Sequence, residues 1–179
     1  MERAARKKLE PPYALHELAY QQIKASGLHH WADRQSNPDQ HPIDPPFLRF
    51  FDSLFETEFM PRTGEVLELG CGSAVFLRWL FAQQGRGISF AGGAGIDVSP
   101  TAIELARAQS KEHSFDLRVH DHVASLAYEK ERFSLVVDSH CLHCVTKAAS
   151  RRRFLANAEA LLAPGGVFVV ATMCTPMHW

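Results

Sequence analysis

The sequence has no long hydrophobic run and only four cysteines among its 179 residues. No stretch approaches the roughly 20 consecutive apolar residues that a membrane-spanning helix needs, so a membrane-embedded protein is not expected. The cysteines are too few and too scattered for a disulfide framework in a chain of this length. We therefore expect a protein of the reducing cytoplasm.

The sequence also lacks an excess of charge of either sign. It has 19 lysines and arginines against 20 aspartates and glutamates, which leaves a formal net charge of −1. No strong field would attract nucleic acid or an anionic membrane surface, and neither is an expected partner. Hydrophobic residues make up 46% of the chain, enough for one soluble domain with its own core.

Two regions are distinguished by their apolar patterns. We expect residues 1–63 to form a helical extension that acts as a lid. We expect residues 64–179 to form the core. Apolar residues at helical spacing predict one helix over 13–26 and a second over 47–59. The first helix carries its apolar stripe at Leu15, Leu18, Ala19 and Ile23.

The core region alternates short apolar segments with helical patterns. Five segments are predicted strands: 65–69, 94–97, 115–121, 134–138 and 165–173. Ser99 and Pro100 are a good cap and first-turn pair for a helix after the second strand. The glycine-rich stretch 85–95 is expected to be the turn before that strand. This alternation predicts an α/β fold with a doubly wound parallel sheet, covered by helices on both faces.

The segment "VLELGCGSA" is the first that indicates ligand chemistry. Gly70 and Gly72 follow a strand and precede a helix, where absent side chains let a ligand approach the backbone. Glu68 precedes the turn, and Asp97 ends the next strand, where a carboxylate can accept hydrogen bonds from both ribose hydroxyls. Val75 stands where a dinucleotide fingerprint would need glycine, which counts against a nicotinamide enzyme.

These motifs together resemble the class I S-adenosylmethionine-dependent methyltransferases over roughly residues 64–175. "GIDVSPTAIELAR" (95–107), "FSLVVDSHCLH" (133–143) and "LLAPGGVFVV" (161–170) follow the glycine turn in the family's order. Asp121 stands where the family often places the acid that meets the adenine amino group. The resemblance implies a Rossmann-like fold and S-adenosylmethionine as cofactor. The expected cofactor-binding residues are Glu68, Gly70, Cys71, Gly72, Asp97, Val98, Asp121, His122, Asp138, Trp31 and Arg34.

Two departures from the family pattern shape the expected function. The fourth strand ends in "DSHC" instead of the N/D-P-P-Y of amino methylation on nucleobases, which favours a small-molecule methyl acceptor. The family's sheet normally has seven strands, and this sequence ends just past the fifth, so a homo-oligomer formed through the fifth strand is expected. A non-catalytic cofactor-binding remnant or partner module is the first alternative. An NAD(P)-dependent oxidoreductase is the second.

The segment "SHCLHC" (139–144) combines an H-x-x-H with a C-x-x-C. In a helical turn Cys141 would lie about 100° around the axis from His140, so the four side chains would not converge on a metal ion. No metal is therefore expected, and a thiol redox role is disfavoured. Plain packing and the wall of an acceptor pocket remain open. In the second case His140 or His143 is the expected catalytic base, because imidazole titrates near neutral pH.

Overall fold

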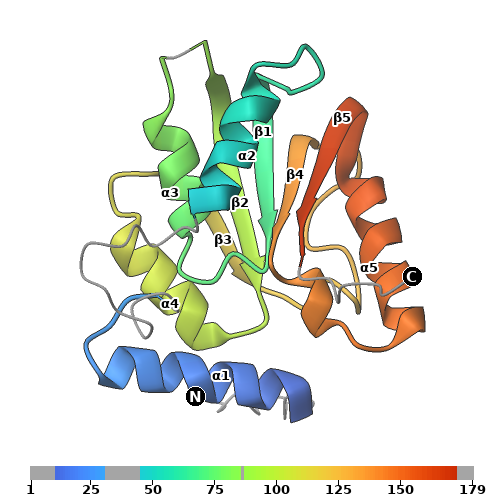
Figure 1. Cartoon of the computed structure of the whole chain (residues 1–179). Coiled ribbons are helices and arrows are strands. Elements are labelled where there is room, and N and C mark those ends of the chain that lie inside the picture. Colours follow the sequence, from blue (N-terminus) through green and yellow to red (C-terminus); the bar gives the residue numbers. More distant parts are fainter. Residues whose placement is uncertain (1–10, 31–44, 86, 173–179) are drawn as a thin grey trace, which may run out of the picture.

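The computed structural model describes residues 11–30, 45–85 and 87–172, and it confirms the predicted α/β architecture (Figure 1). Five parallel strands form one sheet in the order β3-β2-β1-β4-β5. The strands are β1 Thr63–Leu69, β2 Ser89–Asp97, β3 Asp116–Val119, β4 Phe133–Ser139 and β5 Leu162–Ala171. The strand order reverses between β1 and β4, and ligands of doubly wound sheets bind at the carboxyl ends beside such a reversal.

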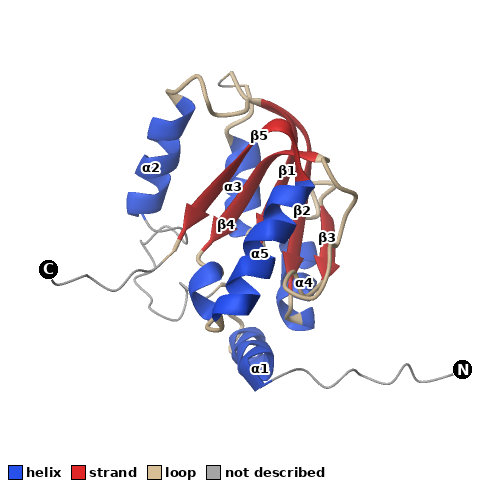
Figure 2. Ribbon diagram, turned by 90° about the vertical axis from the view of Figure 1, so that its right-hand side faces the viewer, coloured by secondary structure: helices blue, strands red, loops and turns tan. Residues whose placement is uncertain are grey.

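Helices cover both faces of the sheet, as the sequence predicts (Figures 1 and 2). The helices are α1 Pro11–Ala25, α2 Pro45–Phe55, α3 Val75–Ala82, α4 Pro100–Gln109, the 3-10 helix η2 Leu142–Cys144, and α5 Ala148–Leu161. α2, α3 and α4 pack on one face through a cluster that includes Phe51, Phe76 and Leu80. α5 packs on the other face through Phe154 and Leu161. Each such buried side chain contributes about 1.5–3 kcal/mol to folding.

The second strand is longer than the sequence predicted. β2 begins at Ser89, so most of the glycine-rich stretch expected to be a turn is strand. The glycines make room for neighbouring side chains: a Cβ on Gly93 would lie 2.8 Å from the Phe115 ring, and a Cβ on Gly95 would lie 2.8 Å from the Cys71 Sγ. The sequence prediction was wrong here because glycine was taken as a turn signal, whereas in a strand it can mark close packing.

The first helix buries only part of the apolar stripe predicted for it, which includes Ile23. Leu15 and Leu18 are 69% and 49% exposed, whereas Tyr20 and Ile23 are buried against Ala102 and Leu105 of α4. α1 therefore docks through a mixed polar and aromatic face, and Figure 1 shows it crossing beyond the ends toward which the strands point. That position places α1 over the edge of the sheet where the predicted site residues lie.

Candidate active site

The turn after β1 has a backbone that only glycine suits. Gly70 and Gly72 have φ of 67° and 52°, in the left-handed region that glycine enters without a steric penalty. A Cβ on Gly70 would lie 2.5 Å from the Cβ of Cys141, and a Cβ on Gly72 would lie 2.3 Å from the Tyr20 hydroxyl oxygen. The turn is thus a backbone surface that the neighbouring side chains of Cys141 and Tyr20 approach closely.

Asp97, at the end of β2, ties this turn to the neighbouring strand. Its Oδ2 accepts a hydrogen bond from the Gly72 N–H at 3.0 Å, and its Oδ1 accepts one from the Ser99 N–H at 2.8 Å. The His16 Nε2 of α1 lies 3.2 Å from Oδ1, and because a carboxylate only accepts, the imidazole donates. The carboxylate is therefore buried and fixed in orientation between the turn, α4 and α1.

Asp121 occupies the corresponding place after β3. Its Oδ1 accepts hydrogen bonds from the Val123 N–H at 2.9 Å and from the Tyr13 hydroxyl at 3.3 Å. Val98 is half-buried next to Asp97 in the chain. Both acids predicted at successive strand ends therefore receive a hydrogen bond from α1.

Glu68 and Asp138 lie deeper, on the neighbouring strands β1 and β4, where the register pairs Glu68 with Val137 and Asp138 with Leu69. Glu68 is 2% exposed. Burial raises its pKa to about 8, although the hydrogen bond that it accepts from the Ser139 hydroxyl acts in the opposite direction. Burial also raises the pKa of Asp138, to about 6. The Asp138 Oδ1 accepts the N–H groups of Cys141 at 3.0 Å and Leu142 at 3.1 Å, so this carboxyl holds the turn that follows β4.

Two other predicted cofactor-binding residues lie within the core. His122 is buried, its Nε2 lies 3.1 Å from the Phe154 carbonyl oxygen of α5, and burial lowers its pKa to about 4. Its imidazole is thus neutral and directed at α5. Cys71 is buried against Gly95, and burial raises the pKa of its thiol. Trp31 and Arg34 lie outside the described residues.

The segment after β4 forms one wall of a pocket of about 320 Å³. The lining residues are Phe47, Phe50, His140, Val170, Ala171 and Thr172. His140 is exposed and has a left-handed φ of 69°, and its N–H donates to the Ala171 carbonyl at 2.8 Å. Its ring centroid lies 5.7 Å from that of Phe47 and 6.4 Å from that of His143. Within residues 11–30, 45–85 and 87–172, no group of three His, Cys, Asp or Glu side chains is arranged to hold a metal ion.

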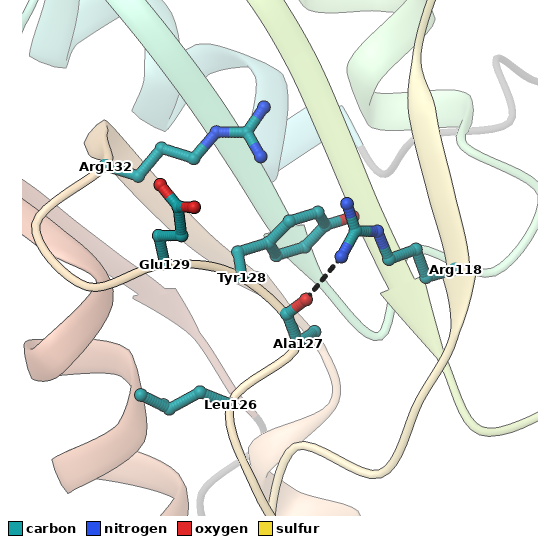
Figure 3. Close-up of a pocket in the computed structure, with 6 residues that line it drawn as sticks. All are labelled: Arg118, Leu126, Ala127, Tyr128, Glu129 and Arg132. Atoms are coloured by element: carbon teal, nitrogen blue, oxygen red, sulfur yellow. Dashed lines mark hydrogen bonds between the residues drawn. The ribbon is translucent and has the colours of Figure 1, made fainter.

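A second pocket, of about 410 Å³, lies toward the amino end of β3 (Figure 3). The Arg118 guanidinium stacks 4.1 Å over the Tyr128 ring, donates to the Ala127 carbonyl oxygen at 2.6 Å and pairs with Asp116 at 2.7 Å. Arg132 pairs with Glu65 at 2.6 Å. Because both arginines already have carboxylate partners, we assign this pocket no ligand.

Residues 67–168 match the sequence model of a family described as a methyltransferase domain. The chain belongs to this family. The predicted membership of the S-adenosylmethionine-dependent methyltransferases is thereby confirmed, and with it the cofactor on which the family depends. Among the described helices, none combines the length and hydrophobicity that crossing a membrane requires.

The chain is similar to a ubiquinone biosynthesis O-methyltransferase of Methylobacterium sp. (strain 4-46), with 31% identity over 63% of this chain and 42% of that protein. It is also 26% identical to a phthiotriol/phenolphthiotriol dimycocerosates methyltransferase of Mycobacterium tuberculosis, over 80% of this chain and 52% of the relative. The chain therefore spans about half the length of these curated relatives.

Solved structures agree with the fold. An S-adenosylmethionine-dependent methyltransferase of Mesorhizobium loti has a TM-score of 0.54 and 26% identity, covering 71% of this chain and 52% of that one. An S-adenosylmethionine-dependent methyltransferase of Clostridium acetobutylicum has a TM-score of 0.59 at 16% identity. The match covers 88% of this chain and 56% of that one. The second likeness is one of fold alone.

The sequence reasoning missed the polar face of α1. Tyr13, His16 and Tyr20 reach Asp121, Asp97 and Gly72 respectively. Their spacing of three and four residues places them on one side of a helix, and this is the signal that could have identified them. The prediction considered only the apolar residues of this helix, Leu15, Leu18, Ala19 and Ile23.

Proposed function

We propose that this chain binds S-adenosylmethionine at the carboxyl ends of β1, β2 and β3 and transfers its methyl group to a small-molecule acceptor. In this proposal residues 64–179 are the cofactor-binding core and residues 1–63 contribute the lid. The observation that carries it is the Asp97 carboxylate, fixed at the end of β2 by the Gly72 N–H beside a turn that admits no side chain. An acidic hydrogen-bond acceptor next to a glycine turn suits the diol and adenosine of the cofactor.

The chain's own residues bind and orient. Asp97 would accept the ribose hydroxyls, and Asp121 lies at the next strand end, where the adenine would extend. S-adenosylmethionine, when bound, supplies a methyl group already activated on a sulfonium, so no covalent bond to the protein is needed. The protein then has to hold the acceptor in line and exclude water.

We place the acceptor in the pocket beside His140. Phe47 and Phe50 of α2 provide an apolar wall, and His140 provides a side chain that can take a proton from a hydroxyl, amine or thiol. Burial and the neighbouring His140 lower the pKa of His143, which favours a neutral ring next to His140. The names of the two curated relatives, one of them an O-methyltransferase, support a small acceptor that carries a hydroxyl.

The test is calorimetric titration of S-adenosylhomocysteine into the parent chain, Asp97→Asn and the control Asp116→Asn. Asp116 lies on the neighbouring strand at its opposite end and pairs with Arg118. Hydrogen bonds to a charged group contribute about 1.5–3 kcal/mol, so Asp97→Asn should bind roughly 10- to 100-fold more weakly. The Asp116→Asn chain should bind like the parent.

The same titration separates the alternatives. If Asp97→Asn binds as tightly as the parent, the assignment of the ribose site is wrong. Binding of NAD(H) in place of S-adenosylhomocysteine would indicate the oxidoreductase. Tight binding without any methylated product from a pool of small hydroxyl compounds would indicate a non-catalytic cofactor-binding module.

A further inference from the structure

We propose that the His16 side chain competes with the ribose of the cofactor for Asp97, so that α1 carries a latch that must release Asp97 before both ribose hydroxyls can bind. This inference rests on the proposed function, because it assigns the ribose to Asp97. It adds a determinant of cofactor affinity that lies on α1, 81 residues from Asp97 in the chain.

The Asp97 carboxylate can accept only a limited number of hydrogen bonds. An ionised carboxylate has about four acceptor positions, two on each oxygen. Within the described residues three are in use: Oδ1 accepts from Ser99 and His16, and Oδ2 accepts from Gly72. A ribose that presents both hydroxyls needs two positions, and one remains. One of the three donors therefore has to leave.

His16 is the donor that can leave. The Gly72 and Ser99 donors are backbone N–H groups of the turn and of the cap of α4, so their release would unfold the site itself. The His16 donor is the end of a side chain that is 32% exposed at the rim. A rotation of its χ angles frees the outer position on Oδ1 without moving any strand.

The helix that carries His16 is held independently of this contact. The Glu17 carboxylate accepts hydrogen bonds from the Ser99 hydroxyl at 2.6 Å, and from the Thr101 hydroxyl at 2.6 Å and N–H at 3.2 Å. Tyr20 and Ile23 pack against α4 one and two turns further along. The latch is therefore the His16 side chain, and α1 stays docked when it opens.

The charges around His16 make the latch dependent on pH. The titratable groups that contact His16 or act on its charge are Asp97 at the end of β2 and Glu17 and Tyr20 on its own helix. Burial lowers the pKa of His16, but the hydrogen bond and charge of Asp97 outweigh it, so the pKa is raised overall. The charged latch is strongest below this pKa and weakens as the pH rises through it. Cofactor affinity should rise over the same range.

The experiment measures S-adenosylhomocysteine affinity by calorimetry at pH 5.5 and pH 8. For the parent chain we expect affinity about tenfold weaker at pH 5.5, because displacing the charged imidazole costs roughly one charge-assisted hydrogen bond. His16→Ala should bind more tightly than the parent at both values, with no such pH dependence. His16→Gln keeps a neutral donor, so it should bind with intermediate affinity and also lose the pH dependence. Leu15→Ala, an exposed position on the same helix, is the matched control and should behave like the parent.

A second readout follows the imidazole itself. NMR titration of the His16 ring should give a pKa above the ordinary value of 6.5 in the free chain, and a lower pKa when the chain is saturated with S-adenosylhomocysteine. If His16→Ala binds no tighter than the parent, or more weakly, the latch is refuted while the proposed function stands. If the parent and both His16 variants fail to bind at pH 8, the proposed function fails and the latch fails with it.

Discussion

The carboxyl groups of Asp97 and Glu68 lie in different environments. Asp97 receives two backbone N–H groups and an imidazole, which are the donors an ionised carboxylate needs. Glu68 of β1 is buried and accepts a hydrogen bond from the Ser139 hydroxyl of β4, and burial raises its pKa from 4.5 to about 8. At neutral pH Glu68 is therefore mostly protonated. The two acids of the glycine-turn region therefore differ in role.

Glu68 should make the folded chain less stable as the pH rises. Between about pH 4.5 and 8 the unfolded chain releases this proton while the folded chain keeps it, so the free energy of unfolding falls across that window. Glu68→Gln should remove this part of the slope, whereas Glu58→Gln, at an exposed position, should retain it. Urea unfolding at pH 5 and pH 8 without cofactor measures both. Equal slopes in the parent and Glu68→Gln would show that Glu68 ionises normally.

His140 should affect turnover and leave cofactor binding unchanged. Asparagine tolerates the left-handed φ of this position, so His140→Asn removes the base with little strain. Loss of a general base costs about 10²- to 10⁴-fold, so kcat should fall by at least about 100-fold. Affinity for S-adenosylhomocysteine should stay within twofold, because His140 lies at the acceptor pocket. If kcat is unchanged, His140 is not the base. His143 would then be the candidate, and the kcat of His143→Ala tests it.

One carboxylate, that of Glu17, makes several of the polar contacts that dock α1 on α4. Glu17 caps the start of α4 with three hydrogen bonds, and although burial raises its pKa, the bonds from Ser99 and Thr101 lower it overall. The Lys24–Glu104 pair also joins α1 to α4, but both side chains are exposed. Exposed ion pairs contribute little, whereas hydrogen bonds to a partly buried carboxylate contribute more.

Glu17→Gln should therefore loosen α1 far more than Glu104→Gln. We expect amides of Pro11–Ala25 to exchange hydrogen roughly tenfold faster or more in Glu17→Gln, because charge-assisted bonds are worth about 1.5–3 kcal/mol. Glu104→Gln is the matched control and should change exchange by less than about fivefold. Hydrogen exchange followed by mass spectrometry measures both. Equal protection in the two variants would show that α1 is held by Tyr20 and Ile23 alone.

Among the described residues, the two edge strands of the sheet are β3 and β5. Among the described residues, β5 pairs with β4 and has no strand on its other side. Its last five residues, Val167–Ala171, are apolar and uncharged. An apolar edge of this kind offers unpaired N–H and C=O groups to another chain.

We expect the 179-residue chain to associate with itself through β5 at micromolar concentrations. Light scattering over a concentration series should give a mass that rises above that of one chain. The same chain carrying a designed β-hairpin that pairs with β5 should be a monomer, and a scrambled hairpin of equal composition is the control. A stable monomer of the unmodified chain at all concentrations would contradict this expectation.

Features specified by adjacent residues could be read from the sequence. The glycine turn depends on the backbone of Gly70 and Gly72, and the start of α4 depends on Ser99, whose hydroxyl accepts the Ala102 N–H. Asp97 was assigned because it ends a strand that follows the turn. The strand order then follows from the family resemblance and the parallel alternation.

Features specified by long-range contacts required the tertiary structure. Leu15 and Leu18 look like a docking face in the sequence, but they are exposed, and the contacts that hold α1 come from residues about 80 positions away. Gly93 looks like a turn residue, yet the ring of Phe115 requires its small size within a strand. The sequence alone determined the turn, the caps and the acid at the strand end, because each depends on neighbours along the chain. Only the tertiary structure decided which face of α1 meets that acid, because this depends on side chains that folding brings together.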